Sequence, residues 1–209
     1  MARADAELIH VGKHHGEQEH TQEQILELIR VNALAGKTVG RLKGGDPLIF
    51  GRGAEEWAFA LSLGIEVELI PGVSSAVALA GLAGIPLTYR RLSQSFAVIT
   101  GHCKQGRAQD WHRYAQIDTL VILMGVENRA LIAQSLIEAG RQATEPVAFI
   151  QRGSLPEEVV RESTLGEVAA GAVAVKTPAV FVVGEVVRLR EQLGPNARVP
   201  PARVRAKES

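Results

Sequence analysis

Thiol and metal chemistry have little support in this sequence. Cys103 is the single cysteine, so it cannot form an internal disulfide, and it is too isolated to build a thiolate metal site. His14, His15 and His20 lack the spacing of a helical zinc pair, and no carboxylate or cysteine completes a ligand set with them. We therefore expect no metal and a reducing compartment.

Net charge and long apolar segments are also missing. The chain has 23 Lys plus Arg and 23 Asp plus Glu, so no overall field attracts nucleic acid or an acidic membrane. No segment approaches the roughly 20 apolar residues of a membrane span. Residues 1–7 carry alternating charges that do not fit a signal peptide. These features predict a cytoplasmic protein with neither a membrane nor a nucleic-acid partner.

Two nucleotide-binding motifs are present only in part. Gly36-Lys37-Thr38 resembles the end of a phosphate-binding loop, but Val31 occupies the position of the required earlier glycine, and the tripeptide follows a predicted helix. Gly51-Arg52-Gly53 begins a dinucleotide fingerprint, but Glu56 stands where the third glycine belongs. The sequence thus predicts neither a P-loop nor a dinucleotide fold.

Short apolar runs alternate with longer amphipathic ones along the whole chain, which is typical of an α/β protein. We expect strands at residues 7–11, 38–42, 65–70, 96–100, 119–124, 146–150, 159–163 and 179–183. We expect helices at residues 21–35, 54–63, 74–83 and 128–139, and a short one after Thr164. Thr21 with Gln24, and Thr164 with Glu167, form capping boxes at two helix starts. The short connection from 146–150 to 159–163 predicts an antiparallel hairpin and hence a mixed sheet.

A change of pattern divides the chain in two. Gly84-Ile85-Pro86-Leu87 and the polar residues 90–95 interrupt the apolar pattern, which indicates a domain junction. We expect an N-terminal α/β domain at residues 1–89 and a C-terminal α/β domain at residues 93–193. Residues 194–209 are basic and contain proline, so we expect a disordered tail there.

Two strand-to-helix connections could carry chemistry. Residues 41–47, Arg-Leu-Lys-Gly-Gly-Asp-Pro, place two glycines where a ligand can approach the main chain, and Asp46 can accept hydrogen bonds. Residues 71–75, Pro-Gly-Val-Ser-Ser, place hydroxyls and main-chain amides at a helix start. A tight turn at the first connection, and simple helix capping by Ser74 or Ser75 at the second, are the alternatives.

Taken together, these segments resemble the uroporphyrinogen III C-methyltransferases of the tetrapyrrole methylase family. The resemblance extends from about residue 11 to residue 193. It is carried by Val11-Gly12-Lys13, Gln22, residues 41–47, Phe50-Gly51-Arg52-Gly53, Pro71-Gly72-Val73, residues 83–88, Thr100-Gly101-His102, Met124-Gly125 and Thr177-Pro178-Ala179, in the family's order and spacing.

The resemblance implies a fold, a cofactor and a reaction. The tetrapyrrole methylase fold has two α/β domains, a mostly parallel N-terminal sheet and a mixed C-terminal sheet, with the methyl donor in the cleft between the domains and a homodimer as the usual assembly. The donor is S-adenosyl-L-methionine, which leaves as S-adenosyl-L-homocysteine. The reaction is C-methylation of uroporphyrinogen III to precorrin-2, on the routes to sirohaem and cobalamin.

Carried over position by position, the resemblance also implies site residues. The implied donor-binding residues are Gly44, Gly45, Asp46, Ile49, Ser74, Ser75, Met124 and Gly153. Lys13 matches the family's proton donor. The substrate has eight carboxylates, and the candidate cations for them are Lys13, Arg41, Lys43, Arg52, Arg90 and Arg91.

The sequence departs from the family pattern at its start. The family's first strand, its Gly-x-Gly-Pro-Gly-Asp loop and its second strand do not precede Glu7, so we expect an N-terminally truncated first domain with exposed apolar surface and unpaired strand edges. His14 stands where arginine is usual, and Gln18 where histidine is common. Two alternatives to the methyltransferase therefore stay open: an enzyme for a later corrinoid intermediate, and a non-catalytic fragment that binds the donor or a tetrapyrrole.

Overall fold

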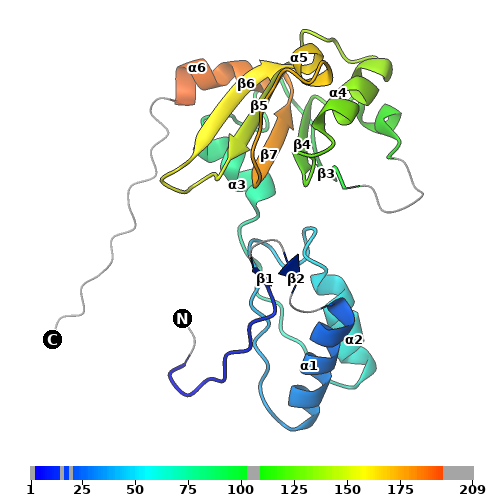
Figure 1. Cartoon of the computed structure of the whole chain (residues 1–209), viewed down its shortest axis with the longest axis vertical. Coiled ribbons are helices and arrows are strands. Elements are labelled where there is room, and N and C mark those ends of the chain that lie inside the picture. The colour runs from blue at the N-terminus through cyan, green and yellow to red at the C-terminus, as the bar shows by residue number, and fades with distance from the viewer. Residues whose placement is uncertain (1–2, 15–16, 19–20, 103–108, 195–209) are drawn as a thin grey trace, which may run out of the picture. The chain divides into compact units, whose positions relative to one another are not determined.

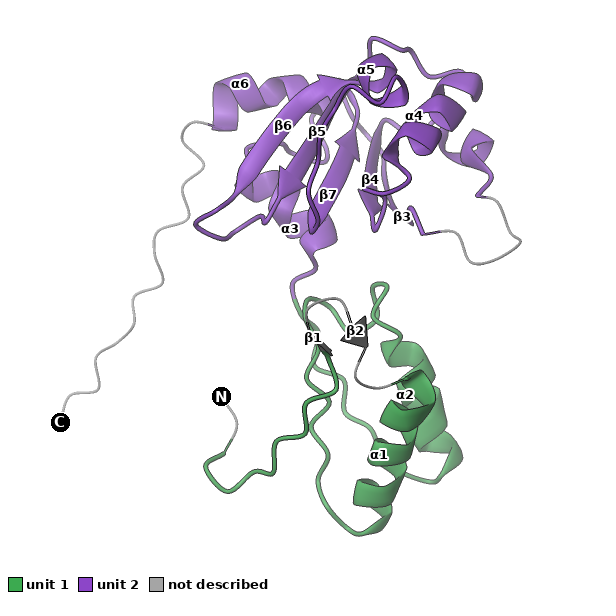
Figure 2. Cartoon of the chain, in the orientation of Figure 1, with its two compact units in different colours: residues 1–72 green, residues 73–209 purple. Residues whose placement is uncertain are grey.

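The computed structural model of the chain divides into two compact units, Met1–Gly72 and Val73–Ser209 (Figure 2). It describes residues 3–14, 17–18, 21–102 and 109–194. Cys103 and the predicted tail after Gly194 lie outside the described residues. No helix among the described residues is long and apolar enough to cross a membrane, and no cluster of candidate metal ligands occurs among them.

Unit 2 is built on one mixed five-stranded sheet (Figure 1). Its strands are β3 (Phe96–Thr100), β4 (Thr119–Leu123), β5 (Pro146–Gln151), β6 (Val159–Thr164) and β7 (Ala179–Val183), in the order β3-β4-β7-β5-β6. β3 pairs with β4 in parallel, and the other three pairings are antiparallel. The predicted mixed sheet and the hairpin of β5 with β6 are therefore confirmed.

Both faces of this sheet are covered, because its central strands are apolar on both sides. Leu120 and Ile122 of β4 contribute to one core, and Val121 between them contributes to the other. The first core also contains residues of η1 (Trp111–Tyr114), α4 (Arg129–Glu138) and α5 (Leu165–Ala169). The second contains residues of α3 (Ser75–Leu82) and η2 (Glu185–Leu189), which α6 (Arg190–Leu193) follows. The continuous apolar runs of β4 and β5 follow from this double burial.

The predicted junction at residues 86–95 lies inside unit 2, whereas the units divide between Gly72 and Val73. Ala76 and Ala80, one helical turn apart on α3, are fully buried against the sheet of unit 2. Ile85 is fully buried in the same core. The Gly-Ile-Pro segment that interrupts the pattern thus lies within unit 2. The domains 1–89 and 93–193 stay a prediction.

Unit 1 contains two helices and very little sheet. α1 (Gln22–Leu34) begins at the predicted capping box, in which Thr21 and Gln24 each accept a hydrogen bond from the other's backbone N–H. α2 (Gly53–Ser62) follows the Gly-Gly-Asp-Pro loop. The described strands of this unit are two-residue segments, β1 (Lys13–His14) and β2 (Glu17–Gln18), which pair antiparallel.

The predicted strands at residues 7–11, 38–42 and 65–70 do not form a sheet among the described residues. The mostly parallel N-terminal sheet is therefore absent from this part of the chain, since the three segments do not pair with one another. As a result the core of unit 1 is small. Ile25 and Ala60 are the buried apolar side chains among its described residues, whereas Leu42 is 90% exposed.

Candidate functional site

Asp46 connects two loops of unit 1. Its Oδ1 accepts from the backbone N–H of Leu48 at 2.8 Å, and its Oδ2 accepts from the backbone N–H of Gly72 at 3.2 Å. The loops also touch through the main chain, because a Cβ added to Gly72 would lie 2.3 Å from the carbonyl oxygen of Gly45. Only glycine permits that approach. The two predicted connections, 26 residues apart, thus meet in one place.

The same loop leaves backbone open to a ligand. Gly44 and Gly45 are exposed, and an ideal Cβ on Gly44 would meet no atom within 4 Å. Ile49, whose backbone N–H donates to the carbonyl oxygen of Asp46 at 3.3 Å, is also exposed. The exposed main chain of Gly44 and Gly45 and the exposed apolar side chain of Ile49 therefore belong to the same loop. This combination suits a ligand with both polar and apolar parts.

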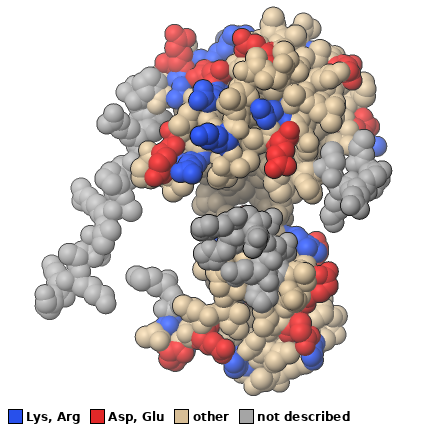
Figure 3. Space-filling model, viewed as in Figure 1, with Lys and Arg blue, Asp and Glu red and all other residues tan. Residues whose placement is uncertain are grey.

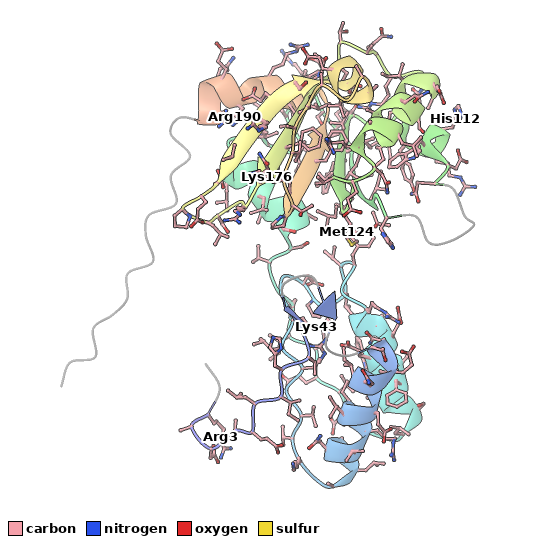
Figure 4. The ribbon with its side chains drawn as sticks, in the orientation of Figure 1. Arg3, Lys43, His112, Met124, Lys176 and Arg190 are labelled. Atoms are coloured by element: carbon pink, nitrogen blue, oxygen red, sulfur yellow. The ribbon has the colours of Figure 1, made fainter. Side chains whose placement is uncertain are left out.

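Glu56 of α2 anchors the start of this loop. It is 6% exposed, and its carboxylate accepts from Lys43 Nζ at 2.9 and 3.1 Å, from Gln22 Nε2 at 3.1 Å and from Arg41 Nε at 3.4 Å. Lys43, labelled in Figure 4, has a side chain that is only 11% exposed. Two of the predicted cations for substrate carboxylates, Arg41 and Lys43, are thus already paired with a buried carboxylate.

Ser74 and Ser75 have different surroundings at the start of α3. Ser74 is buried and is the N-cap, with its Oγ accepting from the backbone N–H of Ala76 at 3.2 Å. The capping alternative is therefore correct for Ser74. Ser75 is the first helical residue and is exposed.

In unit 2, Met124 and Gly153 lie at one edge of the sheet. β3, β4 and β5 run in the same direction, so their carboxyl ends share that edge. Met124 follows β4 with φ 55° and is 54% exposed (Figure 4). Gly153 follows β5, where a Cβ would lie 2.8 Å from both methyl groups of Leu79 in α3. Because β7 lies between β4 and β5, the two strands that lead to these residues are about 10 Å apart.

Backbone in an uncommon conformation gathers at this edge. Besides Met124, Arg152 has φ 48° and Ser154 has φ 69° in the connection after β5. The backbone N–H of Arg152 donates to the carbonyl oxygen of Pro178 at 3.0 Å, which fixes the connection against the start of β7. Non-glycine residues with positive φ are frequent at ligand sites.

The other four cations predicted to bind substrate carboxylates differ in their exposure and in their ion pairs. Lys13 lies in β1, and its side chain is outside the described part of the chain. Arg52 pairs with Glu55 at 2.5 Å on the exposed start of α2. Arg90 and Arg91 are exposed in the connection before β3. Over the surface drawn in Figure 3, Lys and Arg alternate with Asp and Glu, in keeping with the zero net charge.

Sequence reasoning missed two features of the site. From the sequence, Glu56 is only the residue that interrupts a dinucleotide fingerprint, and its role as a buried ion-pair partner is not predicted. The presence of two cations, Arg41 and Lys43, shortly before it in the sequence is the signal that could have indicated this role. The strained connection at Arg152 and Ser154 carries no local signal, since neither residue type favours positive φ.

A sequence profile of the tetrapyrrole (corrin/porphyrin) methylases matches residues 2–169, which is well over half of the chain. The chain belongs to this family. Siroheme synthase 2 of Yersinia pestis (strain Pestoides F) is 45% identical to it over 195 residues, which cover 92% of this chain. The match covers 41% of that relative, so the chain spans less than half the length of the curated methylase relatives it resembles.

Solved structures give the same fold. The uroporphyrin-III C-methyl transferase of Thermus thermophilus, complexed with S-adenyl homocysteine, superposes with a TM-score of 0.74 at 45% identity, covering 80% of this chain and 75% of that one. A cobalt precorrin-4 methyltransferase superposes with a TM-score of 0.72 at 20% identity, a likeness of fold alone. The tetrapyrrole methylase fold implied by the sequence is therefore confirmed.

Proposed function

We propose that this methylase transfers methyl groups from S-adenosyl-L-methionine to carbon atoms of uroporphyrinogen III and forms precorrin-2, for sirohaem or cobalamin synthesis. The observation that supports it most is the 45% identity to the Thermus thermophilus uroporphyrin-III C-methyl transferase, over 80% of this chain. The cobalt precorrin-4 methyltransferase shares only 20% of residues, which favours uroporphyrinogen III over a later corrinoid.

The chain's own groups fit the methyl donor. We propose that the exposed main chain of Gly44 and Gly45 and the apolar side chain of Ile49 contact the donor in unit 1. Met124 and Gly153 are the proposed contacts in unit 2, where Met124 offers an exposed, polarizable thioether. Ser75 adds an exposed hydroxyl. Asp46 and Ser74 act mainly through the backbone, because their oxygens already bind backbone N–H groups.

The proposed reaction mainly requires that the reacting pyrrole carbon be aligned with the S–CH3 bond of the donor. A pyrrole carbon supplies the electron pair of the new C–C bond, the S–CH3 bond breaks, and its electron pair stays on sulfur, which becomes a neutral thioether. The positive charge passes to the macrocycle and is discharged as a proton. Holding the carbon in line with the S–CH3 bond is therefore the main task that we propose for the site. Lys13 is the residue that we propose exchanges protons with the macrocycle.

The substrate's carboxylates require cations that are not already used. Since Glu56 holds Arg41 and Lys43, the better placed candidates are Arg90 and Arg91, which are exposed and form no ion pair among the described residues. Arginine suits this role because its guanidinium pairs with a carboxylate through two hydrogen bonds. The homodimer and the cytoplasmic location also stay predictions, which gel filtration with light scattering and cell fractionation would test.

Calorimetric titration with S-adenosyl-L-homocysteine, joined to a product assay with uroporphyrinogen III, tests this function. We expect binding and a dimethylated product. Binding without methyl transfer would favour the non-catalytic alternative, and transfer to a corrinoid instead would favour the later-pathway enzyme. Absence of both binding and transfer would contradict the proposal.

A variant of Asp46 tests the donor loop in the same titration. Asp46→Ala removes the acceptor of two backbone N–H groups, and we expect roughly tenfold or more loss of affinity for S-adenosyl-L-homocysteine. Asp46→Asn keeps one oxygen acceptor and should fall between. Asp110→Ala, which removes an exposed ion pair with Arg113 in unit 2, is the matched control and should bind as the parent does. Equal affinity of all three variants would refute the role of this loop.

A further inference from the structure

The segment Thr100-Gly101-His102 carries part of the family resemblance, and the proposed function gives it no role. It stands at the end of β3, which pairs in parallel with β4 so that Thr100 lies opposite Leu123. The carboxyl ends of the two strands are therefore neighbours. His102 follows β3 as Met124 follows β4, so both residues belong to the edge of the sheet where the donor contacts of unit 2 are proposed.

The connections that leave β3 and β4 touch through their main chains. The backbone N–H of Gly101 donates to the carbonyl oxygen of Leu123 at 2.7 Å. A Cβ added to Gly101 would lie 2.4 Å from the Cα of Gly125, so this contact requires glycine. His102 and Met124 are each one residue from the touching pair. Their backbones are consequently neighbours across the two strand ends.

Two side chains hold the backbone at His102 in place. Thr100 Oγ1 accepts from the backbone N–H of His102 at 3.2 Å, and Asn128 Nδ2 donates to the carbonyl oxygen of Gly101 at 3.2 Å. Asn128 is the N-cap residue of α4, but its side chain makes no capping hydrogen bond there. Its amide instead serves this connection, which gives His102 a defined position.

The imidazole ring of His102 is not used by the protein itself. The residue is exposed, and within the described part of the chain its only hydrogen bond is that of its backbone N–H. A polar side chain on a fixed backbone can bind a ligand with little loss of conformational entropy, because only its own rotamers become restricted. These properties suit a ligand contact.

The strand order indicates which ligand His102 would contact. Along this edge of the sheet the order is β3, β4, β7, β5, and the proposed donor contacts Met124 and Gly153 follow β4 and β5. A donor held by those two residues extends across β7. β3 is then the next strand outward, beside Met124 and away from Gly153. A group at the end of β3 is therefore placed to contact the molecule bound beside the donor, which is the methyl acceptor.

We propose that the imidazole of His102 binds a carboxylate of the tetrapyrrole, an inference that rests on the proposed function. Uroporphyrinogen III has carboxylates on every pyrrole ring, so each side of the macrocycle offers an acceptor. A neutral imidazole donates one N–H to such a carboxylate, and an imidazolium donates two and adds a positive charge. His102 thus supplies a hydrogen-bond donor at this edge, whereas Arg41 and Lys43 already pair with Glu56.

Anaerobic calorimetric titration of uroporphyrinogen III into the complex with S-adenosyl-L-homocysteine tests this contact. We expect His102→Ala to weaken tetrapyrrole binding by about tenfold, the effect of losing a hydrogen bond to a charged group, with the affinity for S-adenosyl-L-homocysteine unchanged. His102→Gln keeps an N–H donor and should fall between. His102→Phe keeps a flat ring without a donor and should bind as weakly as His102→Ala.

His112→Ala is the matched control. His112 is also an exposed histidine of unit 2, but it lies in η1, well away from Met124 (Figure 4). We expect this variant to bind the tetrapyrrole as the parent does.

Three results would overturn the inference while leaving the proposed function intact. The first is equal tetrapyrrole affinity of the parent and His102→Ala. The second is parent-like affinity of His102→Phe, which would mean ring contact without a hydrogen bond. The third is an equal loss of S-adenosyl-L-homocysteine affinity in His102→Ala, which would assign the residue to the donor. A parent chain that binds no tetrapyrrole would contradict the proposed function and this inference with it.

Nuclear magnetic resonance of the unchanged protein separates contact from an indirect effect of mutation. The histidine rings are labelled with nitrogen-15, and the signals of His102 and His112 are assigned from the variants His102→Gln and His112→Gln. We expect uroporphyrinogen III to shift the ring signals of His102 and to leave those of His112 in place. Unshifted His102 signals in the saturated complex would overturn the inference even if His102→Ala bound weakly, because that loss would then come from the disturbed connection.

Discussion

Glu56→Ala should destabilise unit 1 strongly, because it removes a buried carboxylate that three side chains share. The change leaves the ammonium of Lys43, which is 11% exposed, without its partner at 2.9 Å. It also leaves the amide of Gln22 and the guanidinium of Arg41 without theirs. Removing one partner of a buried ion pair costs about 3 to 5 kcal/mol. We expect about 3 kcal/mol here, since Arg41 is partly exposed and can be solvated.

Two further variants separate the charge from the packing. Glu56→Gln retains one oxygen acceptor, so it should cost less than Glu56→Ala. The double variant Glu56→Ala with Lys43→Met removes both charges and should recover part of the loss, because no uncompensated ammonium stays buried. Glu27→Ala removes an exposed pair with Arg30 on α1 and is the matched control, which should leave the stability of unit 1 nearly unchanged because solvent screens an exposed pair.

Tryptophan fluorescence during urea unfolding can follow the two units separately. The chain has two tryptophans, with Trp57 in unit 1 and Trp111 in unit 2. In a Trp111→Phe background the signal therefore reports unit 1 alone. A cost below about 1 kcal/mol for Glu56→Ala, or a double variant no more stable than that single one, would refute the argument that Glu56 compensates a buried charge.

Two further predictions concern local contacts. Gly72→Ala would place a Cβ 2.3 Å from the carbonyl oxygen of Gly45, so we expect it to lower the free energy of unfolding by about 1 to 3 kcal/mol in the same fluorescence assay. Gly40→Ala is the control and should cost little, because its Cβ would meet no atom within 4 Å. Equal effects of the two variants would contradict the close approach of the two loops. The pKa of Asp118 is held below its usual value of 3.8, first by the backbone N–H of Gln94 and then by the hydroxyl of Ser95. A lowered folded-state pKa contributes stability that is present above the unfolded-state pKa and is lost as pH falls through the folded-state pKa. Below about pH 4 the parent should therefore lose more stability than Asp118→Asn does, as measured by acid titration of unit 2 in a Trp57→Phe background; identical acid profiles would count against this.

Local signals were sufficient to predict the elements whose partners lie within unit 2. The capping box at Thr164 and Glu167 involves residues three apart, so it is readable from the sequence and forms in the structure. The apolar runs of β4 and β5 predict strands, and these strands form because each has a partner strand on both sides. The same kind of signal at residues 38–42 and 65–70 indicated strands that do not form a ladder among the described residues. Extended propensity favours a strand, but only a neighbouring strand supplies the hydrogen bonds.

The candidate site shows the same division between local and distant information. Gly44, Gly45 and Asp46 could be identified from the sequence because two adjacent glycines and an aspartate follow a predicted strand. That Asp46 binds the N–H of Gly72 could not be predicted, since this contact joins residues 26 apart. The division between Gly72 and Val73 has no local signal for a similar reason. Small residues in α3 fit many surroundings, and only the packing of Ala76 and Ala80 shows that this helix belongs with unit 2.

The Gly-Gly-Asp-Pro loop of unit 1, residues 44–47, is held by its own contacts although the expected sheet is not formed among the described residues. Asp46 holds Leu48 and Gly72, Glu56 holds Lys43, and none of these contacts uses a strand ladder. The geometry of this loop is therefore fixed without the strands expected at residues 38–42 and 65–70.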